Sequence, residues 1–361
     1  MAHVATITID HTKVPGDLTD YVGLIVPDGS AGYSALYALC LEGGGDIRLF
    51  KSDDTTELAR EIVSFSVSSE TGEIHYKYSG TLSSSVDTPI HVYADGSSSD
   101  YAVGATYGRN AVWTDYGGVW HMNGSGTTLT DSTGNGNTGT KDTSTRPEEI
   151  NGQIGKAQQG TNASQEIEAG SDASIDDLWS GGGTLSCWTK QTNYPGINGG
   201  SSGWPFGKND ISGWVIFSSS GRNMEMYHAF SSSAARFNIG NDFGLGTRKK
   251  LTIKYNKDSS SNRPTYYVNA TKPTVVVQAA PSGSPASDAS GSLYMMNRVS
   301  GGQAYDGDLD EVRFRKSYMV SDNWEEAEYN NQNSYSTFYS VAAVSGGSPA
   351  QAARRGVIMM M

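Results

Sequence analysis

Two segments decide the fold of this chain: AVWTDYGGVWHMNGSGTTLTDSTGNGNTGT, residues 111–140, and GDLDEVRFRKSYMVSDNWEEAEYNNQNSYSTFYSV, residues 307–341. In the first, residues 131–137 alternate oxygen-bearing side chains with glycines, as tight turns do. In the second, the strand-like GDLDEVRFR precedes Ser321, a residue type that often caps a helix. We therefore expect a β-rich domain that opens near residue 113 and closes near residue 341.

The composition agrees with short strands joined by turns. Apolar residues make up 36% of the 361 residues and charged residues 18%, while Gly contributes 44 residues and Tyr 20. Glycine, Ser, Thr and Asn favour turns, and Tyr favours strands. All seven Trp lie between Trp113 and Trp324. This step in composition supports a domain boundary between about residues 108 and 116.

Alternation with a period of two recurs along the first part of the chain. Ile74, Tyr76 and Tyr78 alternate with polar residues, and TLSCWTK at 184–190 shows the same pattern further on. Half-buried antiparallel strands produce this pattern. Turn clusters such as Pro27-Asp28-Gly29 separate the strands. The fold class expected is all-β, with two antiparallel β-sandwiches.

The segments 111–140 and 307–341 resemble the opening and closing signatures of a laminin G-like, concanavalin A-type jelly roll. The stretch 43–96, GGGDIRLF to HVYADG, followed by YGRNAVW, resembles a small β-sandwich of unassigned function that often precedes such domains. The resemblance implies three parts: an N-terminal sandwich at 1–112, a jelly roll at 113–341, and a linker with an apolar tail at 342–361. Proteins with this layout are frequent among tailed-phage structural proteins and bacterial surface proteins.

The charge and the cysteines exclude some classes of protein. A formal net charge of −12 disfavours binding to nucleic acid, because acidic chains repel phosphates. No run approaches the ~20 apolar residues of a membrane span, and the N-terminus lacks the pattern of a secretory signal. Cys40 and Cys187 fall in different expected domains, so we expect two buried free thiols.

A calcium site is the first candidate for chemistry. Ca²⁺ prefers six to eight oxygen ligands, and a loop such as DSTGNGN can supply several of them. Asp131, Asn135 and Asn137 are the candidate ligands, with Asp310 of the closing strand completing the site. The alternative is structural, with Asp131 capping backbone N–H groups and the two Asn residues forming turns. No other cofactor is expected.

A glycosidase site is the second candidate. Asp306, Asp308 and Asp310 alternate, so a strand would place the three carboxylates on one face, and paired carboxylates hydrolyse glycosidic bonds. The closing strand of laminin G-like domains carries D-E-V without catalysis, which favours a structural role for them. No catalytic residue is assigned, and the chain is expected not to be an enzyme.

Aromatic residues in expected loops are candidates for sugar binding. Tyr194 in NYPG and Trp204 in SSGWPFGKND lie among polar residues that could bind sugar hydroxyls. The alternative is that Trp204 packs beneath its own loop.

The C-terminal tail is a candidate for docking to a partner. VSGGSPAQAA resembles a flexible linker, and ARRGVIMMM supplies five apolar residues after two arginines. The candidate docking residues are Arg354, Arg355, Val357, Ile358, Met359, Met360 and Met361. The alternative is a disordered end.

These observations predict a non-enzymatic structural or adhesive protein. The expected role is that of a phage virion component (a decoration, fibre or tail protein) that forms homo-oligomers, contacts other virion proteins and binds a cell-surface glycan. A carbohydrate-binding module of a bacterial surface protein is the alternative, with an extracellular location. A glycosidase that uses the Asp306–Asp310 face is the third reading.

Overall fold

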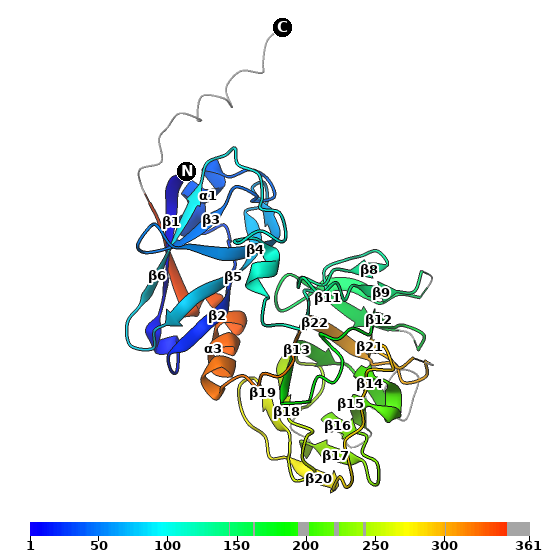
Figure 1. Cartoon of the computed structure of the whole chain (residues 1–361). Helices are drawn as coiled ribbons and strands as arrows, with labels where there is room; N and C mark the ends of the chain where they lie inside the picture. Colours follow the sequence, from blue (N-terminus) through cyan, green and yellow to red (C-terminus); the bar gives the residue numbers. More distant parts are fainter. Residues whose placement is uncertain are drawn as a thin grey trace. The chain divides into compact units, whose positions relative to one another are not determined.

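The computed structural model describes residues 1–143, 145–161, 163–193, 202–219, 224–240, 243–299 and 301–344. Within these ranges the chain is nearly all β, and its strand pairs are antiparallel, which confirms the expected fold class (Figure 1). The chain forms two compact units, Met1–Val112 with Glu326–Met361, and Trp113–Glu325. The second unit is therefore inserted into the sequence of the first.

The first unit is built on one seven-stranded sheet. Its elements are β1 (Ala2–Ile9), β2 (Leu18–Ile25), α1 (Ser34–Leu39), β3 (Arg48–Lys51), β4 (Glu57–Ser66), β5 (Thr71–Leu82), β6 (Thr88–Ala94), α2 (Arg109–Val112), α4 (Tyr335–Phe338) and β23 (Tyr339–Ala343). The strand order is β2-β5-β4-β3-β6-β1-β23. Strand β4 pairs with β3 at its start and with β5 along the rest of its length, so it links the two halves of the sheet.

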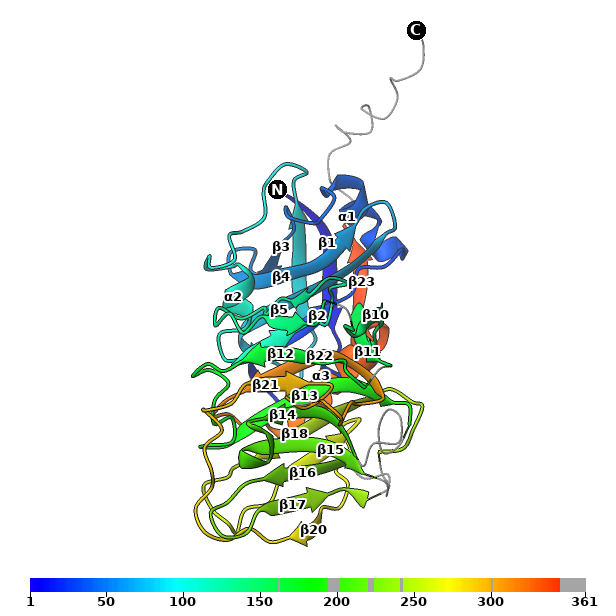
Figure 2. The same ribbon diagram turned by 90° about the vertical axis from the view of Figure 1, so that its right-hand side faces the viewer.

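The C-terminal segment completes this sheet. Strand β23 pairs with β1 from Ala5↔Ala343 to Ile9↔Tyr339, and Figure 2 shows the two strands side by side. Strand β2 lies at the other edge of the sheet, and its Leu24 backbone bonds a side chain of the same segment, Asn331. The domain boundary expected after residue 341 therefore lies earlier in the sequence. Residues 326–343 belong with the first unit, because they supply the strand at one edge of its sheet and cover the strand at the other edge.

The second unit consists of two larger sheets. Its strands are β7 (Gly118–Trp120), β8 (Thr128–Leu129), β9 (Gly139–Lys141), β10 (Glu148–Asn151), β11 (Lys156–Gly160), β12 (Ile167–Gly170), β13 (Gly183–Gln191), β14 (Ser202–Lys208), β15 (Trp214–Ser219), β16 (Met224–His228), β17 (Ala235–Asn238), β18 (Lys249–Tyr255), β19 (Thr265–Val268), β20 (Val276–Ala279), β21 (Leu293–Met295) and β22 (Gly307–Arg315). One sheet has the order β10-β11-β22-β13-β18-β19, with β7 also paired to β22. The other has the order β20-β17-β16-β15-β14-β21-β12-β9-β8, most of which is visible in Figure 2.

An aromatic core lies between the two sheets of the second unit. Trp179 and Trp214 meet edge to face with ring centroids 5.4 Å apart, and Trp120 meets Phe314 in the same way at 5.6 Å. These four side chains are fully buried. Such pairs contribute about 0.5–1.5 kcal/mol beyond their area burial. The core thus accounts for three of the seven Trp residues, Trp120, Trp179 and Trp214.

Two local expectations are confirmed. The side chain of Ser321 accepts a hydrogen bond from the backbone N–H of Trp324 at 3.0 Å, and helix α3 (Asp322–Asn333) follows directly. Cys40 and Cys187 are both buried free thiols. The candidate docking residues Arg354, Arg355 and 357–361 lie outside the residues that the structure describes.

Candidate functional site

The candidate site lies on the outer face of the nine-stranded sheet. Four residues on neighbouring strands β14, β21, β12 and β9 are register partners in a row: Gly207↔Tyr294, Tyr294↔Glu168 and Glu168↔Thr140. Their sequence neighbours Phe206, Met295 and Ile167 belong to the core. Since successive side chains of a strand point to opposite faces, the row faces away from the core.

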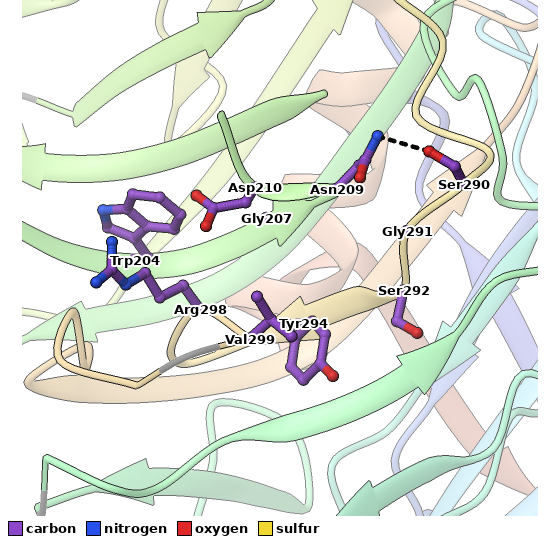
Figure 3. A pocket seen from close by; sticks show the side chains of 10 residues that line it. All are labelled: Trp204, Gly207, Asn209, Asp210, Ser290, Gly291, Ser292, Tyr294, Arg298 and Val299. Carbon is purple, nitrogen blue, oxygen red and sulfur yellow. Dashed lines mark hydrogen bonds between the residues drawn. The ribbon is translucent and has the colours of Figure 1, made fainter. Parts of the chain in front are cut away.

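Gly207 leaves a gap in this row. A hollow of about 280 Å³ lies over it, between Trp204 and Tyr294 (Figure 3). A Cβ added at Gly207 would meet the Cε3 and Cζ3 atoms of Trp204 at 3.5 and 3.8 Å, which is ordinary contact distance. A side chain would therefore fit at position 207. The hollow is open because glycine has no side chain to fill it.

Trp204 reaches the hollow because β14 is irregular. Pairing with β15 shifts register between Gly203 and Phe206. A bulge re-aims the side chains beside it and tolerates Pro205, which lacks an N–H group. The Trp204 Nε1–H donates to Ser202 Oγ at 2.9 Å, which fixes the ring. Only 7% of Trp204 is exposed, so most of the ring is buried in the wall of the hollow.

Backbone conformation shapes the rim of the hollow. Asn209 and Asp210 both adopt the left-handed conformation, with φ of 59° and 50°, which Asn and Asp tolerate better than most residues. The Asn209 side-chain N–H donates to Ser290 Oγ at 3.0 Å. Gly291 passes so close that an added Cβ would lie 2.5 Å from Asn209 Cα. The rim therefore depends on glycine at position 291.

A buried charge network holds this rim from below. The ammonium group of Lys208 donates to the Gly291 carbonyl at 2.6 Å and pairs with Asp176 at 2.7 Å. Asp288 is fully buried 3.9 Å from the same ammonium, and burial raises the pKa of its carboxyl group. Removing one partner of a buried ion pair costs several kcal/mol. The loop that carries Ser290 and Ser292 is thus fixed by charges that do not line the hollow.

Tyr294 is the aromatic residue best placed to meet a ligand. It is half-buried in the row, and burial together with the neighbouring Glu168 carboxylate raises the pKa of its hydroxyl to about 12. The hydroxyl is protonated at neutral pH, and its hydrogen bond to Glu168 contributes to that shift. Arg298 completes the wall, with its guanidinium 6.0 Å from the centre of the Trp204 ring and its Nε–H bonded to the Gly301 carbonyl.

This set of groups suits a polyhydroxylated ligand. Aromatic rings bind the C–H faces of sugars, and carboxylate, amide and hydroxyl groups bind sugar hydroxyls. The hollow offers the ring of Tyr294, the exposed part of the Trp204 ring and the side chains of Asn209 and Asp210. Its volume lies near the lower end of the ~300–1,000 Å³ typical of small-ligand pockets.

The structure changes the expected position of Trp204. It lies on strand β14, largely buried, and not in an exposed loop, although it still borders the hollow. Tyr194 lies outside the described residues. The residues that sequence reasoning missed are Gly207, Tyr294 and Arg298. A glycine inside the strand pattern WPFGK was the available signal, because such glycines often mark close approach of a ligand.

Two of the expected calcium ligands, Asp131 and Asn135, form hydrogen bonds within their loop and to residues 116–119. The Asp131 carboxylate accepts from the backbone N–H groups of Val119, Thr133 and Asn137 at 2.8–3.1 Å, and from the Thr133 hydroxyl at 2.8 Å. The Asn135 side-chain amide donates to the Tyr116 and Gly117 carbonyls. The contacts of Asp131 are those of the structural alternative, in which this residue caps backbone N–H groups.

Asp310 bonds a different loop from that of Asp131. One of its oxygens accepts from the backbone N–H groups of Gln153 and Ile154 at 2.5 and 3.0 Å. The Asn137 side-chain amide donates to the Gly117 carbonyl at 2.8 Å and to Ser174 Oγ at 2.9 Å. The hydrogen bonds of the four proposed ligands therefore do not converge on one point. Calcium binding stays a prediction.

A second set of possible metal ligands lies in the first unit. Ligand atoms of Asp10, His11 and Asp87 lie within 4.8 Å of one another. The Asp87 carboxylate accepts from the His11 ring at 2.6 Å and from its backbone N–H at 3.1 Å, while Asp10 caps the backbone N–H of Thr12 at 2.8 Å. These bonds lower the pKa of Asp87. Hydrogen bonds within the protein thus account for the close approach of these three side chains.

The Asp306–Asp310 face holds buried ion pairs. Asp308 is fully buried, and its carboxylate bonds the Arg248 guanidinium at 2.9 and 3.1 Å, with Lys190 at 3.5 Å. Asp310 is also fully buried. Neither residue lines the hollow at Gly207. Both carboxylates are therefore bonded within the protein, Asp308 to cationic side chains and Asp310 to a neighbouring loop.

No helix in the described ranges is long and apolar enough to cross a membrane.

No family model matches the sequence, and no curated protein matches it. Among solved structures, the chain is similar to the binding domain of Paraclostridial Mosquitocidal Protein 1, with 16% identity and a TM-score of 0.47, over 60% of this chain and 52% of that one. It is also similar to the binding domain of botulinum neurotoxin DC, solved in complex with rat synaptotagmin II, with 13% identity and a TM-score of 0.43, over 61% and 52%.

The receptor-binding domain of botulinum neurotoxin mosaic serotype C/D gives 12% identity and a TM-score of 0.44, over 60% and 51%. The chain thus spans about half the length of each of these domains. Likeness at this level transfers neither a ligand nor a function.

Proposed function

We propose that this chain is a non-enzymatic carbohydrate-binding protein of the structural or adhesive type. The observation that carries the proposal is the hollow over Gly207, bordered by the rings of Tyr294 and Trp204 and by convergent polar side chains. A fixed rim lowers the entropic cost of binding, because the loop at Ser290 is already held by the buried Lys208 network. The commitment of Asp308 and Asp310 to buried contacts supports a binding role over glycoside hydrolysis.

The binding site can be tested by a substitution that fills the space over Gly207. Gly207→Val places a β-branched side chain, which strands accept well, into the hollow. We expect at least a tenfold loss of affinity for the glycan, or about 1.4 kcal/mol, with the unfolding midpoint unchanged or raised. Gly104→Val is the matched control, because Gly104 is exposed and an added Cβ there meets nothing within 4 Å.

The measurement is binding to an array of linear oligosaccharides, followed by calorimetry with the best ligand. Absence of binding to every glycan, or equal binding by the wild type and Gly207→Val, would refute carbohydrate binding at this hollow. Hydrolysis of a bound glycan that is abolished by Asp308→Asn would refute the non-enzymatic assignment.

The finer assignment is a virion component, a decoration, fibre or tail protein of a phage. Its support is the resemblance of residues 43–96, 111–140 and 307–341 to families that occur in such particles. In this proposal residues 357–361 dock to another virion protein or to a second copy of the chain. Mass spectrometry of purified particles tests the location. Deleting residues 351–361 tests the docking, since the truncated chain should then oligomerise or incorporate less well.

A further inference from the structure

The row of register partners on the outer face continues beyond the first hollow. A second, shallower hollow of about 390 Å³ borders Thr140 and Glu168, and Asn135 and Ser171 line it as well. Glu168 is the register partner of Tyr294, which lines the first hollow. The two hollows therefore lie next to each other on one sheet, with the Tyr294–Glu168 pair between them.

The span of the two hollows sets the size of the ligand. Strands β14, β21, β12 and β9 are consecutive neighbours, so Gly207 and Thr140 are separated by three strand intervals. Three intervals of about 4.8 Å amount to roughly 14 Å. A single sugar ring fills one hollow and does not reach the other.

The charges around the groove set the chemistry of the ligand. Glu168 and Asp172 line the second hollow, and Asp210 lines the first. Burial, and then the negative charges of Glu168 and Asp142, raise the pKa of the neighbouring Glu166. Among the residues that the structure describes, Arg298 is the one cationic residue that lines either hollow. The potential over the groove is therefore negative, and an anionic glycan would bind against it.

From these observations we infer that the ligand is an uncharged oligosaccharide of three or more residues, which runs across the strands from the hollow at Gly207, over Tyr294, to the hollow at Thr140. This inference rests on the proposed function, because it names the class of glycan bound by the same site. Arg298 contacts the end of the ligand at Trp204, while the Thr140 hydroxyl and the side-chain oxygen of Asn135 supply hydrogen bonds at the far end.

The experiment measures affinity against the length and the charge of the ligand. The probes are linear oligomers of glucose, mannose, galactose, N-acetylglucosamine and galacturonic acid, each from one to six residues long. For a neutral series that binds, affinity should rise at least tenfold from one residue to three or four and then level off. The galacturonic acid series should bind at least tenfold more weakly than the best neutral series.

Two variants separate the parts of the inference. Thr140→Tyr fills the second hollow with a residue that strands favour, so it should remove the gain in affinity with ligand length. Glu168→Gln removes a negative charge at the centre of the groove, so it should narrow the gap between galacturonic and neutral oligomers at least threefold. Glu148→Gln is the control, because Glu148 is exposed on β10 of the other sheet.

The outcomes distinguish this inference from the proposed function. Binding that depends on Gly207 but does not increase with length, or that is indifferent to Thr140→Tyr, would overturn the inference and leave carbohydrate binding standing. Tighter binding of galacturonic acid oligomers than of neutral ones would overturn the charge argument. No binding of any glycan would overturn the proposed function itself.

Discussion

Replacing Asn331 with alanine should destabilise the first unit by about 2–4 kcal/mol. The Asn331 side chain lies on the edge of strand β2, where its oxygen accepts from the Leu24 N–H at 2.7 Å and its amide donates to the Leu24 carbonyl at 2.9 Å. Both residues are buried, at 1% and 2% exposure. The substitution leaves two buried backbone groups without partners, and each such group costs about 1–3 kcal/mol.

The control is Asn333→Ala in the same helix. Asn333 is exposed, so the same change there removes no buried contact. Alanine has the higher helix propensity, by up to about 0.7 kcal/mol, so we expect Asn333→Ala to be neutral or slightly stabilising. The pair of variants thus separates the hydrogen bonds of Asn331 from any general effect of substitution in α3.

The assay can follow each unit by itself. All seven Trp belong to the second unit, so Trp fluorescence reports the unfolding of that unit, while hydrogen exchange at Leu24 reports the edge of β2. Asn331→Ala should accelerate exchange at Leu24 by about 30-fold or more, since 2 kcal/mol corresponds to roughly that factor at room temperature when exchange follows local opening. Unchanged exchange at Leu24, or equal effects of the two variants, would show that Asn331 does not cover this edge.

Three further predictions follow from the same contacts. Ending the chain at Val344 should leave both units folded, whereas ending it at Phe338 removes β23 from β1 and should lower the unfolding midpoint of the first unit in calorimetry. Burial lowers the pKa of His228 from 6.5 to about 4, so the unfolded state takes up a proton first on acidification. Stability of the second unit should therefore fall by up to about 3 kcal/mol between pH 6.5 and 4, and His228→Gln should flatten this slope in urea titrations. A calcium ion held by Asp131, Asn135, Asn137 and Asp310 requires that chelator lower the unfolding midpoint of the second unit; an unchanged midpoint leaves these side chains as turn caps.

Local patterns predicted the strand content well, because alternation and turn residues act within a few positions of each other. The cap at Ser321 was readable for the same reason, since the capping residue and the N–H that it accepts from are three residues apart. The destination of the following helix was not readable. Its later residues bond Leu24, more than 300 positions earlier, and no local pattern encodes that return.

The calcium prediction shows how one composition can have two structural explanations. Alternating Asp, Asn and Gly suits a cation loop and suits a tight turn equally well. The choice depends on whether backbone N–H groups surround the carboxylate, and the donors to Asp131 include Val119, twelve residues earlier. Sequence alone gives the residue types of such a loop and not the number of donors that reach it.

The candidate binding site was only partly predictable from the sequence for a different reason. It exists because one strand residue, a glycine, has no side chain. The search for aromatic residues in the sequence found Trp204, which forms one wall of the hollow and has 7% of its surface exposed. The gap itself is Gly207, and the aromatic ring across it is Tyr294, 87 positions later on a strand that sheet order places next to β14. A strand glycine becomes informative only once its cross-strand neighbours are known, because the same glycine between two small residues would leave a flat surface. Between an indole ring and a tyrosine ring it leaves a hollow, and filling that hollow with Gly207→Val tests the distinction directly.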